Sequence, residues 1–111
     1  MSISRKDLAR TGLLILLAIF LVFNNVFAQV NEREYLNKGT EYFKNDQIDE
    51  AISAFTKAIE LNPDNAPSYN CRADTYYSKK EYNKARNDAT KAQELGFTVD
   101  PRLLESLNKQ K

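Results

Sequence analysis

The strongest constraint on this chain is an internal repeat with a period of 34 residues. Small, aromatic and alanine positions recur in the same order when the frame is shifted by one period. The first copy carries Gly39, Tyr42, Ala51, Phe55, Ala58 and Pro63. The second copy carries Ala73, Tyr76, Ala85, Ala89 and Ala92, with Ala89 in place of the aromatic residue and Phe97 in place of the proline. A period of this length indicates a two-helix unit that stacks on copies of itself.

The repeated residue types explain how such a unit packs. Two helices approach closely only where small side chains face large ones. Gly39 and Ala73 are expected where a neighbouring helix comes close, and Phe55 is expected to fill the space between Ala51 and Ala58. We therefore interpret the repeated residues as core rather than functional, and the same holds for Tyr42, Tyr76, Ala85 and Ala92.

Three elements of the first copy, Gly39-x-x-Tyr42, Ala51-x-x-x-Phe55-x-x-Ala58 and Pro63, resemble the tetratricopeptide repeat (TPR). The resemblance extends over residues 32–111. It implies an all-α fold, a short α-solenoid of two helix–turn–helix repeats followed by a C-terminal capping helix. The expected bounds are about 32–65 for repeat one, 66–99 for repeat two and 100–111 for the cap.

Capping and breaking residues predict where the helices of these units begin and end. The first helix is expected to start within residues 30–36 and to end at Asn45. The second is expected to follow Asp46 as its N-cap and to end at Leu61, and the third to start at Pro67 and to end at the turn of residues 78–81. The fourth is expected to stop at Gly96, and the capping helix to start at Asp100-Pro101.

The N-terminal segment has a different character from the repeats. Basic residues at 5, 6 and 10 precede an unbroken apolar run over residues 12–23, and residues 26–28 offer a cleavage site before Gln29. These are the parts of a secretory signal peptide. As a helix the run is about 18 Å long, shorter than the ~30 Å core of a bilayer.

We therefore expect residues 1–28 to be a cleaved signal peptide and residues 29–111 to form an exported domain, periplasmic or secreted. The alternative is an uncleaved anchor, in which residues 12–30 stay in the membrane. The apolar run is the deciding observation, because it is short for a spanning helix. Contact with a membrane is expected only in the alternative.

Composition excludes several classes of function. Sixteen basic and fifteen acidic residues nearly cancel, so no nucleic-acid partner is predicted. The chain has no His and a single Cys, which excludes Cys/His zinc sites, an internal disulfide and His-based catalysis. Asp46, Asp49 and Glu50 form the densest carboxylate cluster but lack a calcium-loop pattern. We predict no cofactor, no metal and no enzymatic activity.

The TPR resemblance also implies a binding surface, because the first helix of each repeat lines a concave groove. Carried over by position, the groove residues are Leu36, Thr40 and Phe43 in repeat one, Asn70, Asp74 and Tyr77 in repeat two, and Leu104 and Asn108 on the cap. Phe43 and Tyr77 are equivalent residues one repeat apart. They are predicted to form an aromatic pair in the groove, or alternatively to pack into the neighbouring repeat.

One specialised TPR groove is not predicted here. TPR clamps that hold the C-terminal carboxylate of heat-shock chaperones use a Lys and an Asn one turn apart. Leu36 and Thr40 occupy those places, and Cys71 replaces the Asn expected in the next repeat. We interpret Cys71 as a small buried side chain, with pairing to a partner's thiol as the alternative.

The sequence thus predicts an exported, non-catalytic module that binds another protein or peptide segment through its concave groove. The alternative function is a membrane-tethered structural or assembly subunit that retains residues 12–30 as an anchor. Self-association is compatible with both.

Overall fold

The computed structural model of this protein contains five α-helices and no strand over the residues it describes, 4–110 apart from the side chain of Ala28. Residues 1–3 of the predicted signal and Lys111 of the predicted cap lie outside that range. The helices are α1 (Arg5–Lys44), α2 (Ile48–Leu61), α3 (Ala66–Ser78), α4 (Tyr82–Glu94) and α5 (Pro101–Lys109). The predicted all-α fold, with two helical hairpins and a short last helix, is confirmed.

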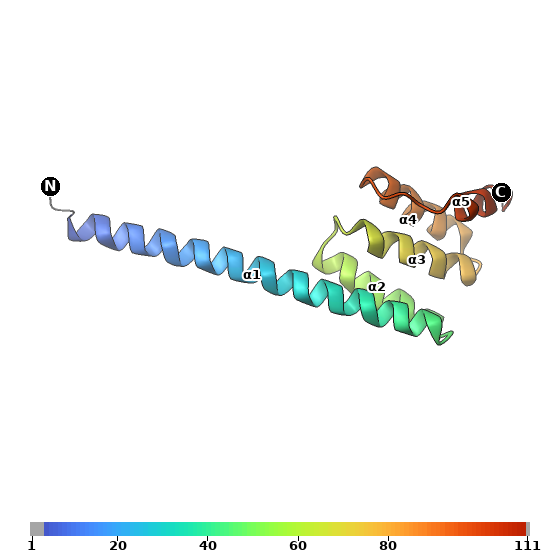
Figure 1. Cartoon of the computed structure of the whole chain (residues 1–111), viewed down its shortest axis with the longest axis horizontal. Coiled ribbons are helices and arrows are strands. Elements are labelled where there is room, and N and C mark those ends of the chain that lie inside the picture. The colour runs from blue at the N-terminus through green and yellow to red at the C-terminus, as the bar shows by residue number, and fades with distance from the viewer. Residues whose placement is uncertain (1–3, 111) are drawn as a thin grey trace.

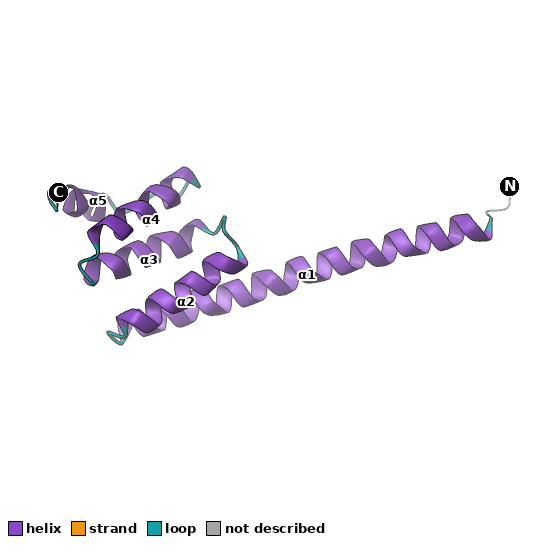
Figure 2. Ribbon diagram, turned by 180° about the vertical axis from the view of Figure 1, so that it is seen from behind, coloured by secondary structure: helices purple, strands orange, loops and turns teal. Residues whose placement is uncertain are grey.

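The molecule is a long rod with a small helical array at one end. Its extents are 73 × 27 × 17 Å, and the long dimension belongs to α1. Helices α2 to α5 stack on one side of the C-terminal half of α1 (Figure 1). Helix α2 packs along α1, α3 packs on α2, and α4 pairs with α3 (Figure 2). This arrangement places α1 and α3, the first helices of the two repeats, side by side.

Helix α1 begins far earlier than the sequence predicted. The first helix was expected to start within residues 30–36, but it begins at Arg5, where Ser4 caps it by accepting a hydrogen bond from the Asp7 backbone N–H at 3.2 Å. The helix continues through Asn24 and Asn25, which follow the apolar run. Asn costs a helix interior well under about 1 kcal/mol, so two of them do not stop it.

The two parts of α1 differ sharply in burial. Every described side chain from Ser4 to Val30 is exposed, whereas Glu32 is 8% exposed and lies where α1 meets the array. Helix α1 is long and apolar enough to cross a membrane, with a mean hydropathy of 2.3 over its most apolar 18 residues. A secretory signal meets the same criterion.

The core of repeat one is built as its residue types predicted. Ala51 and Ala58 are fully buried, and Phe55 between them is 1% exposed. The Phe55 ring lies directly over Gly39 of α1, so that a Cβ atom at Gly39 would come within 2.5–2.9 Å of three ring carbons. A glycine is therefore required at this helix crossing.

The second repeat and the last helix share one hydrophobic cluster. Its buried members are Ala73, Ala85, Ala89, Ala92, Val99, Leu103 and Leu107. Helix α5 is also held by Arg86 of α4, whose Nη2 donates to the backbone oxygens of Leu107 at 2.7 Å and Gln110 at 3.0 Å. A cationic side chain on the last carbonyls of a helix stabilises its C-terminus. Helix α5 thus covers the open end of repeat two.

The turn residues show one wrong prediction and several correct ones. Asp46 is not the N-cap of α2: it adopts a left-handed conformation with φ of 59°, and Gln47 takes the cap position. A sharp reversal between two helices needs such a residue, and Lys80 has the same conformation one repeat later, with φ of 66°. Gly96 follows α4 with φ of 87°, and Asp100 caps α5, both as predicted. Helix α3 begins at Ala66, one residue before Pro67.

Candidate protein-binding groove

Three of the predicted groove residues form a stripe along α1. Leu36, Thr40 and Phe43 are spaced by four and three residues, which places them on one face of the helix. All three are half-buried, so each side chain keeps surface available to a ligand. The Thr40 hydroxyl donates to the Leu36 carbonyl at 2.9 Å, which satisfies its hydrogen on the helix itself.

A second stripe lies on the neighbouring helix α3. Asn70, Asp74 and Tyr77 are also spaced by four and three residues and are half-buried. The Tyr77 ring packs on Tyr82 of α4, with 5.4 Å between ring centroids and planes tilted by 58°. Part of this ring therefore serves its own repeat. The aromatic pair with Phe43 stays a prediction.

The remaining predicted groove residues lie elsewhere. Leu104 packs against the hydrophobic cluster of repeat two, and Leu104 and Asn108 line a recess of about 310 Å³ between α4 and α5. Arg86, Ala89, Thr90, Gln93 and Leu107 complete that recess. The structure places the α1 and α3 stripes on neighbouring helices, and Leu104 and Asn108 of α5 in a separate depression.

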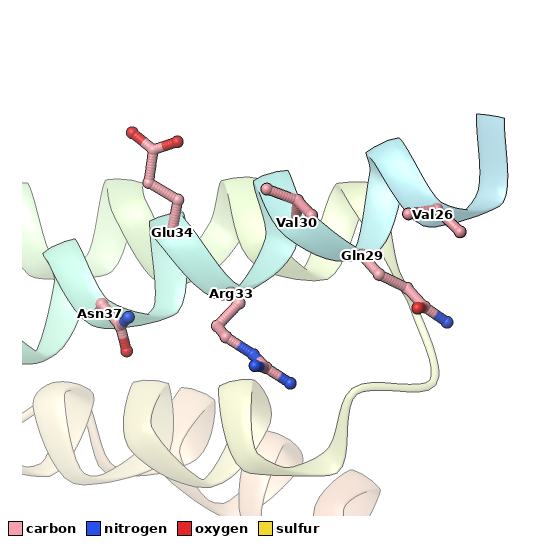
Figure 3. Close-up of a pocket in the computed structure, with 6 residues that line it drawn as sticks. All are labelled: Val26, Gln29, Val30, Arg33, Glu34 and Asn37. Carbon is pink, nitrogen blue, oxygen red and sulfur yellow. The ribbon is translucent and has the colours of Figure 1, made fainter. Parts of the chain in front are cut away.

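Sequence reasoning did not single out the part of α1 that precedes the predicted groove residues. Arg33 and Asn37 line a shallow recess of about 560 Å³ on the surface of α1, together with Val26, Gln29, Val30 and Glu34 (Figure 3). An adjoining recess of about 400 Å³ brings Glu32 and Leu36 together with the α2–α3 turn. Arg33 and Asn37 share a face with Thr40 by their spacing of seven and three residues, which is the signal that could have found them.

Asp74 in the groove carries a carboxylate whose negative charge is unfavourable in the folded state. Burial raises the pKa of Asp74 above its ordinary value, and the negative charge of Asp100 at the start of α5 raises it further. No ion pair with Asp74 is present among residues 4–110. The folded state therefore binds the Asp74 proton more tightly than the unfolded chain does, so Asp74 lowers stability as the pH rises through its folded pKa.

This predicts that Asp74→Asn raises the melting temperature at pH 7. Near pH 3, where the wild-type carboxyl is also protonated, the difference should largely disappear. Melts of both proteins by circular dichroism at the two pH values measure it. Asp64→Asn, which alters an exposed carboxylate in the α2–α3 turn, serves as the control. An equal gain from both variants would mean that net charge, rather than the position of Asp74, sets the effect.

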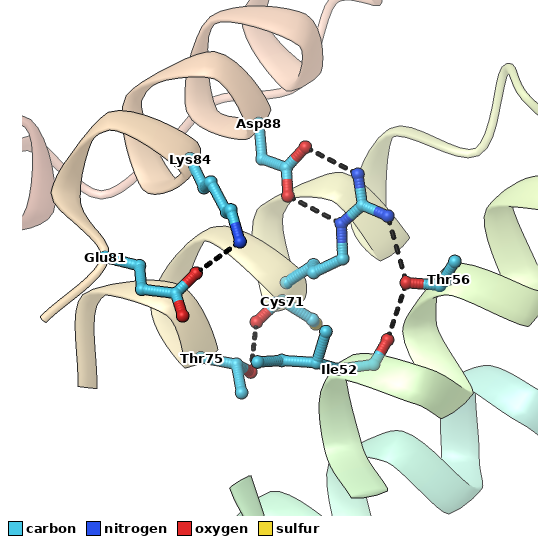
Figure 4. Close-up of polar contacts among 8 residues, drawn as sticks. Ile52, Thr56, Cys71, Thr75, Glu81, Lys84 and Asp88 are labelled. Carbon is cyan, nitrogen blue, oxygen red and sulfur yellow. Dashed lines mark hydrogen bonds and ion pairs between the residues drawn. The ribbon is translucent and has the colours of Figure 1, made fainter. Parts of the chain in front are cut away.

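Behind the groove lies an ion pair that the sequence reasoning did not foresee. Arg72 of α3 donates from Nε to Asp88 Oδ2 at 2.7 Å and from Nη2 to Asp88 Oδ1 at 2.8 Å. Its Nη1 donates to Thr56 Oγ1 of α2 at 3.1 Å (Figure 4). The side chains of Arg72 and Asp88 are 17% and 8% exposed. One guanidinium thus joins α2, α3 and α4 and fixes the angle between the repeats.

The chemistry of Cys71 and of metal-ligating side chains bears on what the groove can do. Cys71 is half-buried, and burial raises the pKa of its thiol, so the reactive thiolate is disfavoured. Among residues 4–110, no three His, Cys, Asp or Glu side chains lie close enough to hold a metal ion. The groove offers shape and hydrogen-bonding groups to a ligand.

Comparisons with known proteins agree with this fold. Residues 33–65 match one tetratricopeptide repeat model, and residues 54–87 match another. Human serine/threonine-protein phosphatase 5 is 40% identical over 62 residues, covering 56% of this chain and 12% of that protein. The TPR repeat-containing thioredoxin TDX of Oryza sativa subsp. japonica is 43% identical over 53 residues, covering 48% and 17%. The Hsp70-Hsp90 organising protein of Plasmodium falciparum is 36% identical over 62 residues, covering 56% and 11%.

The chain therefore spans only about a tenth to a sixth of the length of these relatives. The similarity involves their repeats and says nothing of their other domains. The two family matches overlap over residues 54–65 and together cover residues 33–87, and the 34-residue period and the paired helices agree with them. We conclude that residues 33–87 of this protein are tetratricopeptide repeats.

Proposed function

We propose that this protein is a non-catalytic interaction module that binds a segment of another protein in the groove between α1 and α3. The observation that supports this function is the pair of adjacent half-exposed stripes, Leu36–Thr40–Phe43 and Asn70–Asp74–Tyr77. Apolar and hydrogen-bonding groups alternate along the first stripe, and the second combines two polar side chains with an aromatic one. Such a surface suits an extended or helical peptide better than a small molecule, because the recesses beside it are shallow and open.

The relatives are consistent with this function. The Hsp70-Hsp90 organising protein is named for its action on two other proteins, and it shares 36% identity with the repeats here. The heat-shock carboxylate clamp is not part of the proposal, because Leu36, Thr40 and Cys71 stand where its polar residues are expected. The partner segment is therefore expected to present apolar side chains to Phe43 and Tyr77.

The test is calorimetric titration of the partner recovered from envelope extract with the full chain as bait. Two repeats offer a short groove, so we expect a transient interface with a dissociation constant near ~1 μM. Removal of a buried aromatic anchor often costs ~2 kcal/mol, so Phe43→Ala and Tyr77→Ala should each weaken binding about 30-fold. Tyr35→Ala, at a half-buried aromatic on the outer α1–α2 surface, should bind as the wild type does. Unchanged binding by both folded groove variants would move the site to the convex face.

We further propose that the module works outside the cytoplasm, directed there by its N-terminal segment. Cleavage before Gln29 stays a prediction. Every side chain from Ser4 to Phe27 is exposed, so cleavage would remove none of the packing that the structure describes, which involves Glu32 and later residues. A second candidate is a tethered subunit that keeps this segment. It is supported by the unbroken course of α1 through the cleavage site and by the 21 uncharged residues 11–31, about 32 Å as a helix and close to the thickness of a bilayer core.

Intact mass spectrometry of the protein recovered from the envelope separates the two candidates. Cleavage predicts a soluble species with the mass of residues 29–111. The tethered subunit predicts the full-length mass in the membrane fraction, resistant to extraction at alkaline pH. Replacement of Ala28 by a bulky residue should abolish the shorter species if cleavage occurs before Gln29, because signal cleavage sites require small residues.

A further inference from the structure

The segment of α1 just before the array has two chemically different faces. A helix turns about 100° per residue, so residues three, four and seven apart share a face. In residues 22–31 the amide side chains gather on one face, called here the amide face: Asn24, Asn25, Gln29 and Asn31. The opposite, apolar face consists of Val22, Phe23, Val26, Phe27 and Val30. Residues 12–21 before this segment are apolar on all sides.

The amide face points to the same side as the helical array. Eighteen residues make five full turns, so Asn24 lies in line with Tyr42 and Asn25 in line with Phe43. Tyr42 and Phe43 are half-buried where α1 meets the array. Gln29 itself lines a recess with residues of the α2–α3 turn, and Figure 3 shows its side chain pointing toward that turn. The amides thus continue the packed side of α1 beyond the array.

The apolar face points away from the array. Phe23 lies in line with Glu41, and Val30 lies one turn before Glu34. Both glutamates are exposed, so this side of α1 faces water along the array. Before the array the same side is apolar, and its five residues are between 54% and 72% exposed. The polarity of one continuous helix face therefore reverses between Val30 and Glu34.

We propose that, in the tethered form of the protein, this apolar face lies against the acyl chains of the bilayer while the amide face and the array turn to water. The inference rests on the tethered candidate and adds how that helix leaves the membrane. The bilayer is the occupant because the apolar face continues directly from the all-apolar residues 12–23, within the most hydropathic window of the chain. A bilayer can therefore cover residues 12–23 and the apolar face as one continuous surface.

This placement keeps the amide side chains out of the hydrocarbon, where their burial would be unfavourable. Polar groups without hydrogen-bond partners are strongly destabilised in hydrocarbon, and side-chain amides are among the most affected. A helix that leaves the bilayer upright would place all sides of residues 24–29 at the same depth. A tilted helix, within the usual range of 0–40°, keeps its lower face in the acyl chains while its upper face reaches the headgroups. The array then lies above the helix, away from the membrane.

Cysteine labelling of the full-length chain in lipid vesicles tests this orientation. Cys71→Ser removes the one native thiol, and single cysteines are then placed at two adjacent pairs, Phe23 with Asn24 and Val30 with Gln29. The members of a pair differ in axial position by only about 1.5 Å, so a contrast between them reports the facing side rather than the depth. A membrane-impermeant maleimide, added on the side of the array, should label the amide-face cysteine at least tenfold faster in each pair.

Each other outcome overturns the proposal. Equal labelling within both pairs would show an upright helix, and faster labelling of the apolar-face cysteine would show the opposite tilt. Protection of the apolar face that disappears at a lower protein-to-lipid ratio would show that a second copy covers it. Recovery of residues 29–111 alone would show that the face is removed. Groove binding is measured separately by titration, so its failure leaves the labelling result unaffected. Circular dichroism confirms that each variant stays helical.

Discussion

Gly39→Leu is expected to destabilise the folded array by ~1–3 kcal/mol or more, the usual cost of overpacking a tight core. In a domain of this size, that lowers the melting temperature by roughly 5–20 °C. The reason is geometric, because even a Cβ atom at residue 39 would lie 2.5–2.9 Å from carbons of the Phe55 ring. That ring is 1% exposed, and Ala51 and Ala58 on the same helix are fully buried, so it has little free space into which to move. Thermal melts of the full chain in detergent measure the shift.

The same helix provides a matched control for this substitution. Gly12 also lies within α1, but nothing stands within 4 Å of a Cβ atom built there. Gly12→Leu therefore makes the same chemical change without a steric conflict and should leave the melting temperature of the array unchanged. If Gly39→Leu melts like Gly12→Leu, α1 and α2 do not cross at residue 39.

Arg72→Met is expected to cost about 3–5 kcal/mol, because it leaves a buried carboxylate without its cation. Asp88 is 8% exposed in its side chain and receives two hydrogen bonds from Arg72. The hydrogen bond to Asp88 is also the main reason that the pKa of Arg72 is raised. Urea unfolding of the two proteins, with the slope compared as well as the midpoint, gives the difference in the free energy of unfolding.

Two further variants identify the cause. Lys57→Met removes an exposed ion pair with Glu60, in which both side chains are 58% exposed, and should cost under about 1 kcal/mol. The double variant Arg72→Met with Asp88→Leu removes both charges and should recover much of the loss. A double variant as unstable as the sum of its parts would show that Arg72 acts through packing against the rings of Tyr69 and Tyr76 instead.

The repeat frame was predictable because its positions carry strong steric requirements. Gly39, Phe55 and the buried alanines could be placed from residue size and spacing alone, and their burial confirms the placement. Gly96 and Asp100 were equally informative, since one permits positive φ and the other supplies a capping oxygen. The positions of these residues could be predicted because each residue type has one dominant local role.

The missed features depend on distant partners. Arg72 and Asp88 are 16 residues apart and look like ordinary charged surface residues, and only the pairing of α3 with α4 brings them together. Asp46 was assigned as a cap by residue type, but the sharpness of the turn decided its conformation. The start of α1 was misplaced because Asn24 and Asn25 are weak breakers within a long helix. Leu104 and Asn108 of α5 lie apart from the groove for a similar reason. Their helix register alone does not fix how the last helix docks.

The two left-handed turn residues have a consequence for how this protein could change over evolutionary time. Asp46 and Lys80 stand one period apart with φ of 59° and 66°, and the left-handed region costs a residue with a Cβ atom on the order of 1–2 kcal/mol. Most substitutions at these positions exchange one strained residue for another and are therefore tolerated. Glycine alone would release the strain, at a smaller cost in the entropy of the unfolded chain. The hairpin turns thus hold a reserve of stability that one substitution in each repeat can reach without altering the groove.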